Sequence, residues 1–209
     1  MSAVHRPHGA APTEAALPLT PAATSAEGAR AVFAGVRLAR PDDEAAVYAL
    51  LLELHGENAL ASLAPAKVET MLRRGTRGEG GVIGIIDGPG GIEASISLVM
   101  TQWWYSEEWH LEEMWNFVHP DHRRSTHAKK LVEFAKWTSD RLGMPLLLGI
   151  LTRHRLWPKM RLLQRQVPQV GALFLHNADT SDTFAQRRLE RPAAIGKGSV
   201  PAAGRRIHV

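Results

Sequence analysis

Residues 116–131 organise the rest of this chain, and they read Asn116-Phe117-Val118-His119-Pro120-Asp121-His122-Arg123-Arg124-Ser125-Thr126-His127-Ala128-Lys129-Lys130-Leu131. The first residues predict a strand that stops near Pro120, because proline lacks a backbone N–H and disfavours helix in the residue before it. A short basic loop follows. The next residues predict a helix, since apolar residues recur near a period of 3.6: Ala128, Leu131, Val132, Ala135 and Leu142.

The junction between this loop and this helix suits a phosphate group. Ser125 and Thr126 can cap the helix, which leaves its first backbone N–H groups pointing outward. These N–H groups, the positive end of the helix and the side chains of Arg123 and Arg124 all favour an anion. We therefore expect a phosphate or pyrophosphate to bind here.

Composition and charge limit the classes of protein that fit. The 209 residues are 44% hydrophobic, include no cysteine and contain no apolar run of the roughly 18 residues that span a bilayer. We also see no secretory signal, so we expect a cytoplasmic protein. The isoelectric point is near 9.8, but residues 185–209 hold six Lys or Arg and one Glu, against 19 basic and 20 acidic residues elsewhere. This distribution argues against nucleic-acid binding by the body of the protein. Any contact with nucleic acid would involve the basic tail.

The pattern of apolar runs and turn residues predicts an α/β domain with a central mixed β-sheet flanked by helices. We interpret residues 1–33 as a flexible leader, 34–178 as the domain and 179–209 as a basic C-terminal tail. The predicted elements, in order, are strand 36–39, a helix from Asp42 or Asp43 to Leu54, helix 65–72, hairpin strands 82–86 and 92–101, strand 111–118, helix 126–142, a buried central strand 145–151, helix 156–166 and strand 170–175. Strands 111–118 and 145–151 should be parallel neighbours, because a helix connects them.

This order and residues 118–131 resemble the GCN5-related N-acetyltransferase (GNAT) superfamily, and within it the acetyltransferase-like proteins often encoded by phages. The family pattern is Val-x-Pro, two residues, then Arg/Gln-x-x-Gly-x-Gly/Ala and a helix. Val118 and Pro120 match the lead-in, Arg123 the first motif position, and Ala128 the final small residue. The resemblance covers about residues 34–177.

The resemblance implies a fold, a cosubstrate and a reaction, in which an amine attacks the thioester of acetyl-CoA directly. It implies that pantetheine adds along strand 111–118 and that the following loop holds the pyrophosphate. The residues concerned are Asn116, Phe117 and Val118 for pantetheine, and Arg123, Arg124, Ser125, Thr126, His127, Ala128 and Lys129 for pyrophosphate.

A carboxylate on the same strand is the candidate general base that takes the ammonium proton. Glu112 lies six residues before Val118, so in a regular strand both side chains share a face. Glu113 faces the other way unless a β-bulge shifts the register. The alternative is that these carboxylates merely lie at a solvated strand start.

Two departures from the family pattern favour a second hypothesis, a CoA-binding module that has lost turnover. Arg124 and Thr126 stand where glycines are commonest, so the loop has less backbone freedom. The tyrosine that serves the family as acid after the second parallel strand is missing, since the chain's tyrosines are Tyr48 and Tyr105.

The remaining unusual residues are histidines and aromatics. His119 and His122 form an H-x-x-H without a carboxylate framework, so we expect solvated loop histidines and no metal site. Trp103 and Trp104 should point to opposite faces, which leaves one ring exposed, either to line an acceptor site or to pack at a sheet edge.

The sequence thus predicts an acetyl-CoA-dependent N-acyltransferase. The expected acceptor is an amine on a small molecule or a protein, no membrane partner is expected, and homodimerisation is left open.

Overall fold

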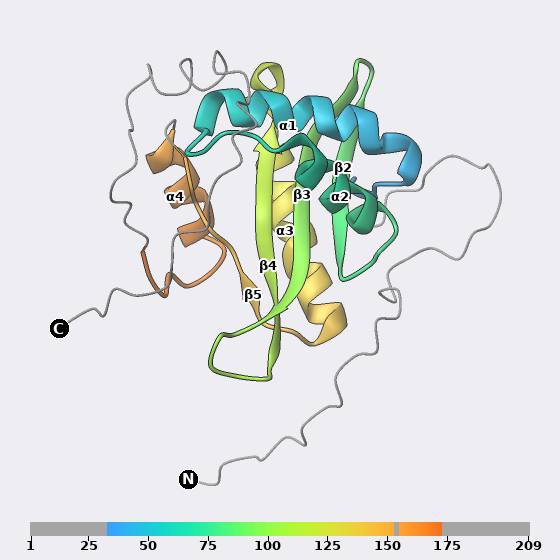
Figure 1. Ribbon diagram of the computed structural model, residues 1–209. Coiled ribbons are helices and arrows are strands. Elements are labelled where there is room, and N and C mark those ends of the chain that lie inside the picture. Colours follow the sequence, from blue (N-terminus) through green and yellow to red (C-terminus); the bar gives the residue numbers. More distant parts are fainter. Residues whose placement is uncertain (1–32, 153–154, 173–209) are drawn as a thin grey trace, which may run out of the picture.

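The computed structural model describes residues 33–152 and 155–172, which form one five-stranded sheet with helices on both faces (Figure 1). The strands follow chain order across the sheet: β1 (Arg37–Leu38), β2 (Gly81–Gly88), β3 (Gly91–Gln102), β4 (Trp109–Val118) and β5 (Leu146–Leu147). Neighbouring strands are antiparallel except β4 and β5, which are parallel. The predicted mixed sheet and the parallel pair are confirmed.

Two helices cover one face of the sheet and one helix covers the other (Figure 1). The helical elements are η1 (Pro41–Asp43), α1 (Glu44–Asn58), α2 (Pro65–Thr76), η2 (Pro120–His122), α3 (His127–Leu142) and α4 (Leu156–Gln164). The α1–α2 side buries Val47, Leu51 and Leu72 against β2. The α3 side buries Leu131 and Phe134 against β2, β3 and β4.

Close packing on the α3 side depends on a glycine in β2. A Cβ at Gly84 would lie 2.7 Å from the ring of Phe134 and 3.0 Å from the side chain of Val36. Phe134 is fully buried, so neither its ring nor the strand can move away without opening a cavity. The absence of a side chain at Gly84 therefore lets α3 approach the sheet.

Arg37 is more than a charge flanking a strand. Its guanidinium donates to both carboxylate oxygens of Asp43, at 2.7 and 2.9 Å, and also pairs with Asp87 at the end of β2. The Arg37 guanidinium holds the pKa of the Asp43 carboxyl below its usual range, although partial burial opposes this effect. This network fastens the start of α1 to the sheet.

Most predicted elements are present, but the last two predicted strands differ. α3 ends at Gly143, whose φ of 63° is the left-handed conformation expected at a helix C-terminus. The prediction of a buried central strand over 145–151 is wrong: β5 is two residues long, partly exposed and placed at the edge of the described sheet. An apolar run alone does not distinguish a central strand from a short edge strand.

Residues 170–172 are not in a strand, and 173–175 of that prediction lie outside the described residues. The leader (apart from Phe33) and the tail 179–209 lie outside them as well. None of the described helices combines the length and the apolar character needed to cross a membrane.

Candidate acyl-CoA site

Strands β4 and β5 pair briefly and then separate. Leu111 pairs with Leu146 and Glu112 with Leu147, and no further pair joins the two strands. Glu113 and residues 115–118 still pair with β3 along one edge, whereas their other edge has no strand partner among the described residues. The chain after β5 runs away from β4 toward α4 (Figure 1). β4 therefore offers open backbone N–H and C=O groups to an extended ligand.

A β-bulge interrupts β4 beside this open edge. Ser97 of β3 pairs with Trp115, but the next residue, Leu98, pairs with Glu113, so Met114 is an extra residue. A bulge changes the alternation of faces along a strand. Residues before Met114 therefore point opposite to what the sequence spacing predicts.

The bulge exchanges the expected positions of the two candidate bases. Val118 pairs with Ala94 and packs on the α3-side core, and Leu111 is buried in that same core. Glu113, two residues from Leu111, takes the face of Val118, and Glu112 takes the α1–α2 face. The prediction that Glu112 shares the face of Val118 is wrong, and the alternative that required a bulge holds.

Glu113 has the most perturbed carboxyl group of the described residues. Burial raises its pKa from 4.5 to about 8, and the ammonium of Lys159 in α4 partly opposes the rise. Its Oε2 is buried and has no hydrogen-bond partner among the described residues. A carboxyl that gains its charge near neutral pH, at the point where two strands separate, is suited to accept a proton.

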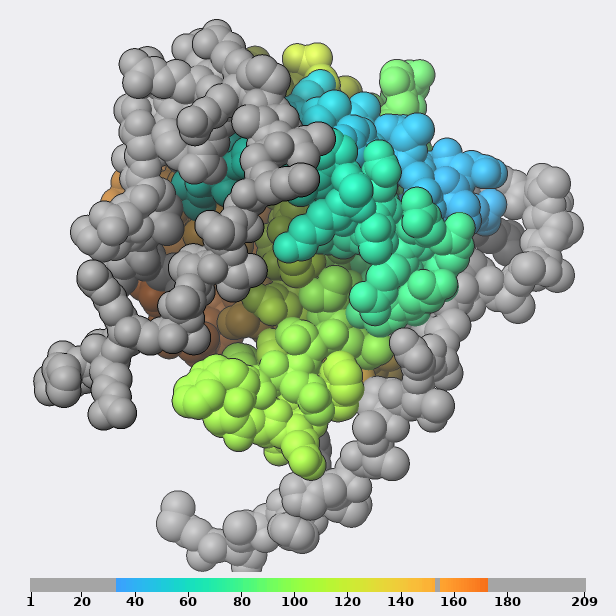
Figure 2. Space-filling model, in the orientation of Figure 1, coloured from blue at the N-terminus to red at the C-terminus, as the bar shows by residue number. Residues whose placement is uncertain are grey.

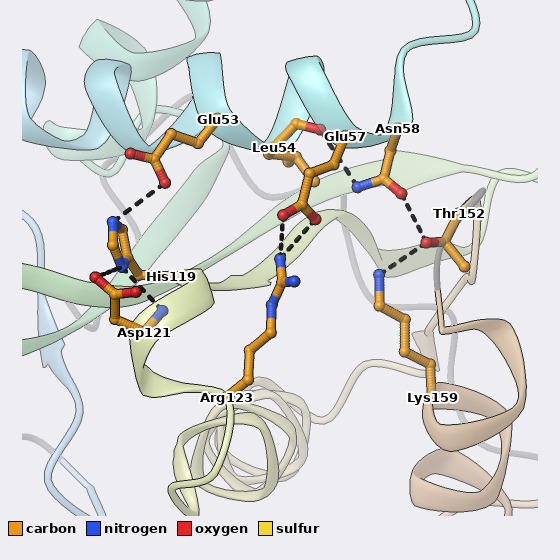
Figure 3. Close-up of polar contacts among 9 residues, drawn as sticks. All are labelled: Glu53, Leu54, Glu57, Asn58, His119, Asp121, Arg123, Thr152 and Lys159. Carbon is orange, nitrogen blue, oxygen red and sulfur yellow. Dashed lines mark hydrogen bonds and ion pairs between the residues drawn. The ribbon is translucent and has the colours of Figure 1, made fainter. Parts of the chain in front are cut away.

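The C-terminal half of α1 contacts both the segment before α4 and the loop before α3 (Figure 3). On the α4 side, Lys159 donates to Thr152 Oγ1 at 3.0 Å, and Thr152 donates to Asn58 Oδ1 at 2.7 Å. Burial lowers the pKa of the Lys159 ammonium. The sequence did not single out this chain of contacts, because its members are 94 residues apart.

On the side of the loop before α3, Arg123 is bound to Glu57 of α1 (Figure 3). Its guanidinium also lies 5.7 Å from the ring centre of Phe117, and 25% of its side chain is exposed. Arg123 is therefore only partly exposed, because α1 folds over the loop. The pyrophosphate assignment for Arg123 stays a prediction, and Glu57 is a competitor for the same guanidinium.

The rest of the predicted pyrophosphate loop lies at the start of α3. Arg124, Ser125, Thr126 and Lys129 are exposed, and Ala128 is partly buried. Ser125 Oγ accepts the N–H of His127 at 3.1 Å, whereas the helix N-cap Thr126 forms no such bond. Of the predicted pair Ser125 and Thr126, Ser125 is thus the residue whose side chain caps the helix. Arg124, Thr126 and Lys129 present their side chains to solvent.

The predicted pantetheine residues lie along the open edge of β4. Asn116 and Val118 are partly buried opposite Ile96 and Ala94, and Phe117 is buried on the α1–α2 side. Their backbone edge toward β5 is the unpaired one described above. Position along the strand, rather than side-chain chemistry, is what these residues contribute.

The histidines of the loop contact carboxylates that the sequence did not associate with them. His119 Nε2 lies 3.2 Å from Glu53 of α1 (Figure 3), and His127 Nε2 lies 2.7 Å from Glu93 of β3. His127 is largely buried, whereas His119 and His122 keep 29% and 38% of their side chains exposed. No spacing signal links Glu93 to the loop, since they lie on different elements.

The aromatic residues divide between core and surface. Trp115 is buried in the core and donates to Ser95 Oγ at 3.0 Å. Trp103 stacks on His110 with ring centres 3.9 Å apart, while Trp104 is 93% exposed. The exposed ring belongs to the β3–β4 hairpin, whose yellow-green atoms project beyond α1 and α2 (Figure 2).

A mixed sheet whose parallel strands separate in front of a strand–loop–helix is the architecture of the GNAT acetyltransferases, and this chain has that fold. A comparison with protein-family models and one with curated proteins found no match.

Solved structures with the same fold include three acetyltransferases. A possible acetyltransferase from Clostridium difficile 630 is 14% identical, with a TM-score of 0.54 over 68% of this chain and 94% of that one. Ribosomal-protein-alanine N-acetyltransferase from Brucella melitensis biovar Abortus 2308 is 13% identical, with a TM-score of 0.50 over 70% and 98%. Aminoglycoside N-acetyltransferase AAC(6')-Iy in complex with CoA is 11% identical, with a TM-score of 0.51 over 68% and 97%.

Proposed function

We propose that this protein is an N-acetyltransferase that transfers the acetyl group of acetyl-CoA to an amine. The observation that carries the proposal is the edge of β4 over residues 113–118, which has no strand partner toward β5 among the described residues. This edge begins at Glu113, a partly buried residue whose Oε2 atom is fully buried, and ends at the loop before α3. One structure with the same fold is a complex with CoA, which supports a CoA ligand.

The open edge and the loop would hold the two ends of the cosubstrate. Backbone groups of Asn116 to Val118 would bind pantetheine as an added strand, which fixes the thioester beside Glu113. The exposed side chains of Arg124 and Lys129 and the N-terminus of α3 would bind the pyrophosphate. Arg123 would join them once Glu57 releases it.

Glu113 is the proposed general base. Its ionised carboxylate first takes one proton from the acceptor ammonium, and the neutral amine then attacks the thioester carbon. When the C–S bond of the tetrahedral intermediate breaks, its electrons go to the CoA sulfur, and the sulfur takes the second proton that the nitrogen loses. Because the pKa of Glu113 is about 8, the rate should rise with pH through that value. Glu112, the other predicted base, points to the opposite face.

The acceptor is proposed as a class. The similar structures include acetyltransferases named for a ribosomal-protein alanine and for aminoglycosides, which are protein and small-molecule amines. Both kinds therefore belong in a substrate panel. A cytoplasmic location and a homodimer stay predictions, as does the narrower likeness to phage-encoded proteins.

Acetyl-CoA binding and turnover test the proposal separately. Isothermal titration should show acetyl-CoA binding, and thiol release with a panel of small amines and N-terminal peptides should show turnover that Glu113→Gln lowers by about 10²- to 10⁴-fold. The matched Glu112→Gln variant should lower it far less. Failure of the wild-type chain to bind acetyl-CoA would refute the proposal.

A CoA-binding module without turnover is the second candidate. Two observations favour it: Glu57 engages Arg123, and α4 contains no tyrosine. Binding of acetyl-CoA without thiol release on any amine of the panel would select this candidate.

A further inference from the structure

One carboxylate oxygen and two ring nitrogens lie close together beside the loop, and they belong to Glu93, His122 and His127. Glu93 Oε2 lies 2.7 Å from His127 Nε2 and 3.4 Å from His122 Nδ1, and all three atoms are within 4.8 Å of one another. The residues come from β3, η2 and the first turn of α3. None of the three has a part in the proposed proton transfer.

The position of the Glu93 carboxylate depends on a neighbouring glycine. A Cβ at Gly88 would lie 1.6 Å from Glu93 Oε1 and 2.1 Å from its carboxyl carbon. The side chain of Glu93 thus occupies the space that Gly88 leaves free, and it is largely buried. Its backbone C=O also accepts the N–H of His119 at 2.9 Å, which fixes the start of the loop to β3.

We propose that Glu93, His122 and His127 form a binding site for a divalent transition metal, with zinc as the best-suited ion. Two imidazoles and one carboxylate are ligands that zinc accepts in sites that keep a fourth position open. With bonds of about 2.0–2.2 Å in a tetrahedron, ligand atoms lie about 3.4 Å apart. The separation of His122 Nδ1 from Glu93 Oε2 has this value, whereas His127 Nε2 and Glu93 Oε2, now 2.7 Å apart, would move apart to admit the ion.

The different exposures of the three side chains indicate where an ion would enter from solvent. His122 is 38% exposed, whereas His127 and Glu93 lie deeper at 13% each. A metal would therefore enter past His122 and join the loop and α3 to β3. His127 Nδ1 is buried without a partner among the described residues, so the support that usually orients a ligand histidine is missing. Such support is worth about 10- to 100-fold in affinity, and we expect correspondingly weaker binding.

Zinc titration of the full chain tests the site. We expect isothermal titration with zinc chloride to show a binding event that Glu93→Gln and His122→Asn each weaken at least about tenfold. His119→Asn is the matched control, because His119 lies on the same loop but faces Glu53. The chain has ten histidines, so the differences between variants, rather than the total zinc bound, decide the result.

Gly88→Ala tests the geometry without touching a ligand. The new methyl group would displace the carboxylate of Glu93, which is the flexible end of a side chain, so the fold should persist. We expect this variant to lose zinc affinity as Glu93→Gln does, while its circular dichroism spectrum matches the wild type. Equal zinc affinity in the wild type, Glu93→Gln, His122→Asn and Gly88→Ala would overturn the proposal. Acetyl-CoA binding is measured apart from these titrations, so either proposal can fail alone.

Discussion

Replacing Glu113 by glutamine should remove a large pH dependence of stability. In the unfolded chain the carboxyl ionises near pH 4.5, whereas burial raises its pKa to about 8 in the folded protein. Between these values the folded state keeps a proton that the unfolded state loses, so stability falls as pH rises and stays low above pH 8. Because each tenfold change in proton affinity is about 1.4 kcal/mol, the loss amounts to about 5 kcal/mol at most.

The measurement is urea unfolding of the wild type and of Glu113→Gln at pH 5, 6, 7, 8 and 9. Glutamine has nearly the same shape as glutamate and no charge. As pH rises, the free energy of unfolding of the variant should therefore increase relative to that of the wild type, by several kcal/mol in total. Glu112→Gln controls for the loss of one carboxylate from β4 and should track the wild type. The reasoning fails if the free energies of unfolding of the wild type and Glu113→Gln change in parallel with pH. It also fails if Glu112→Gln has an effect equal to that of Glu113→Gln.

Three further predictions concern α1 and the core. Glu57→Gln removes the carboxylate that binds Arg123, so titration should show acetyl-CoA binding severalfold tighter than in the wild type; unchanged affinity would mean that the pair does not compete with the ligand. Arg123→Gln should weaken the same binding about tenfold if its guanidinium contacts phosphate, whereas an effect of its charge at a distance would fade with added salt. Gly84→Ala should cost about 1–3 kcal/mol in urea unfolding, because its methyl group meets the ring of Phe134. Gly90→Ala, with nothing within 4 Å, is the control and should cost far less.

Local chemistry was enough to predict the strand, loop and helix around residues 116–131. Pro120 lies just after the end of β4, Ser125 caps the following helix and Gly143 ends it in the left-handed conformation. These effects act within one or two turns of chain, which is why they are legible in the sequence. The hairpin of β2 and β3 was predicted on the same basis.

The β-bulge at Met114 could not be predicted from the alternation of residues along the strand. Alternation of faces predicts Glu112 as the inward carboxylate, and one extra residue reverses that order. The sequence Glu112-Glu113-Met114 contains no proline or glycine to mark the irregularity. The position of the extra residue is set by the pairing of β4 with β3, which depends on the residues of both strands.

Burial and long-range pairing account for the remaining differences. The apolar run after Pro145 looks like a central strand, but it separates from β4 and leaves an open edge. Glu57 and Glu93 are ordinary surface carboxylates in the sequence, yet α1 and β3 bring them to Arg123 and His127. Local propensities and steric limits belong to neighbouring residues, so the sequence alone specifies the elements around residues 116–131. Desolvation and ion pairing depend on residues distant in the chain, so the acidity of Glu113 and the partners of the loop follow from the folded packing.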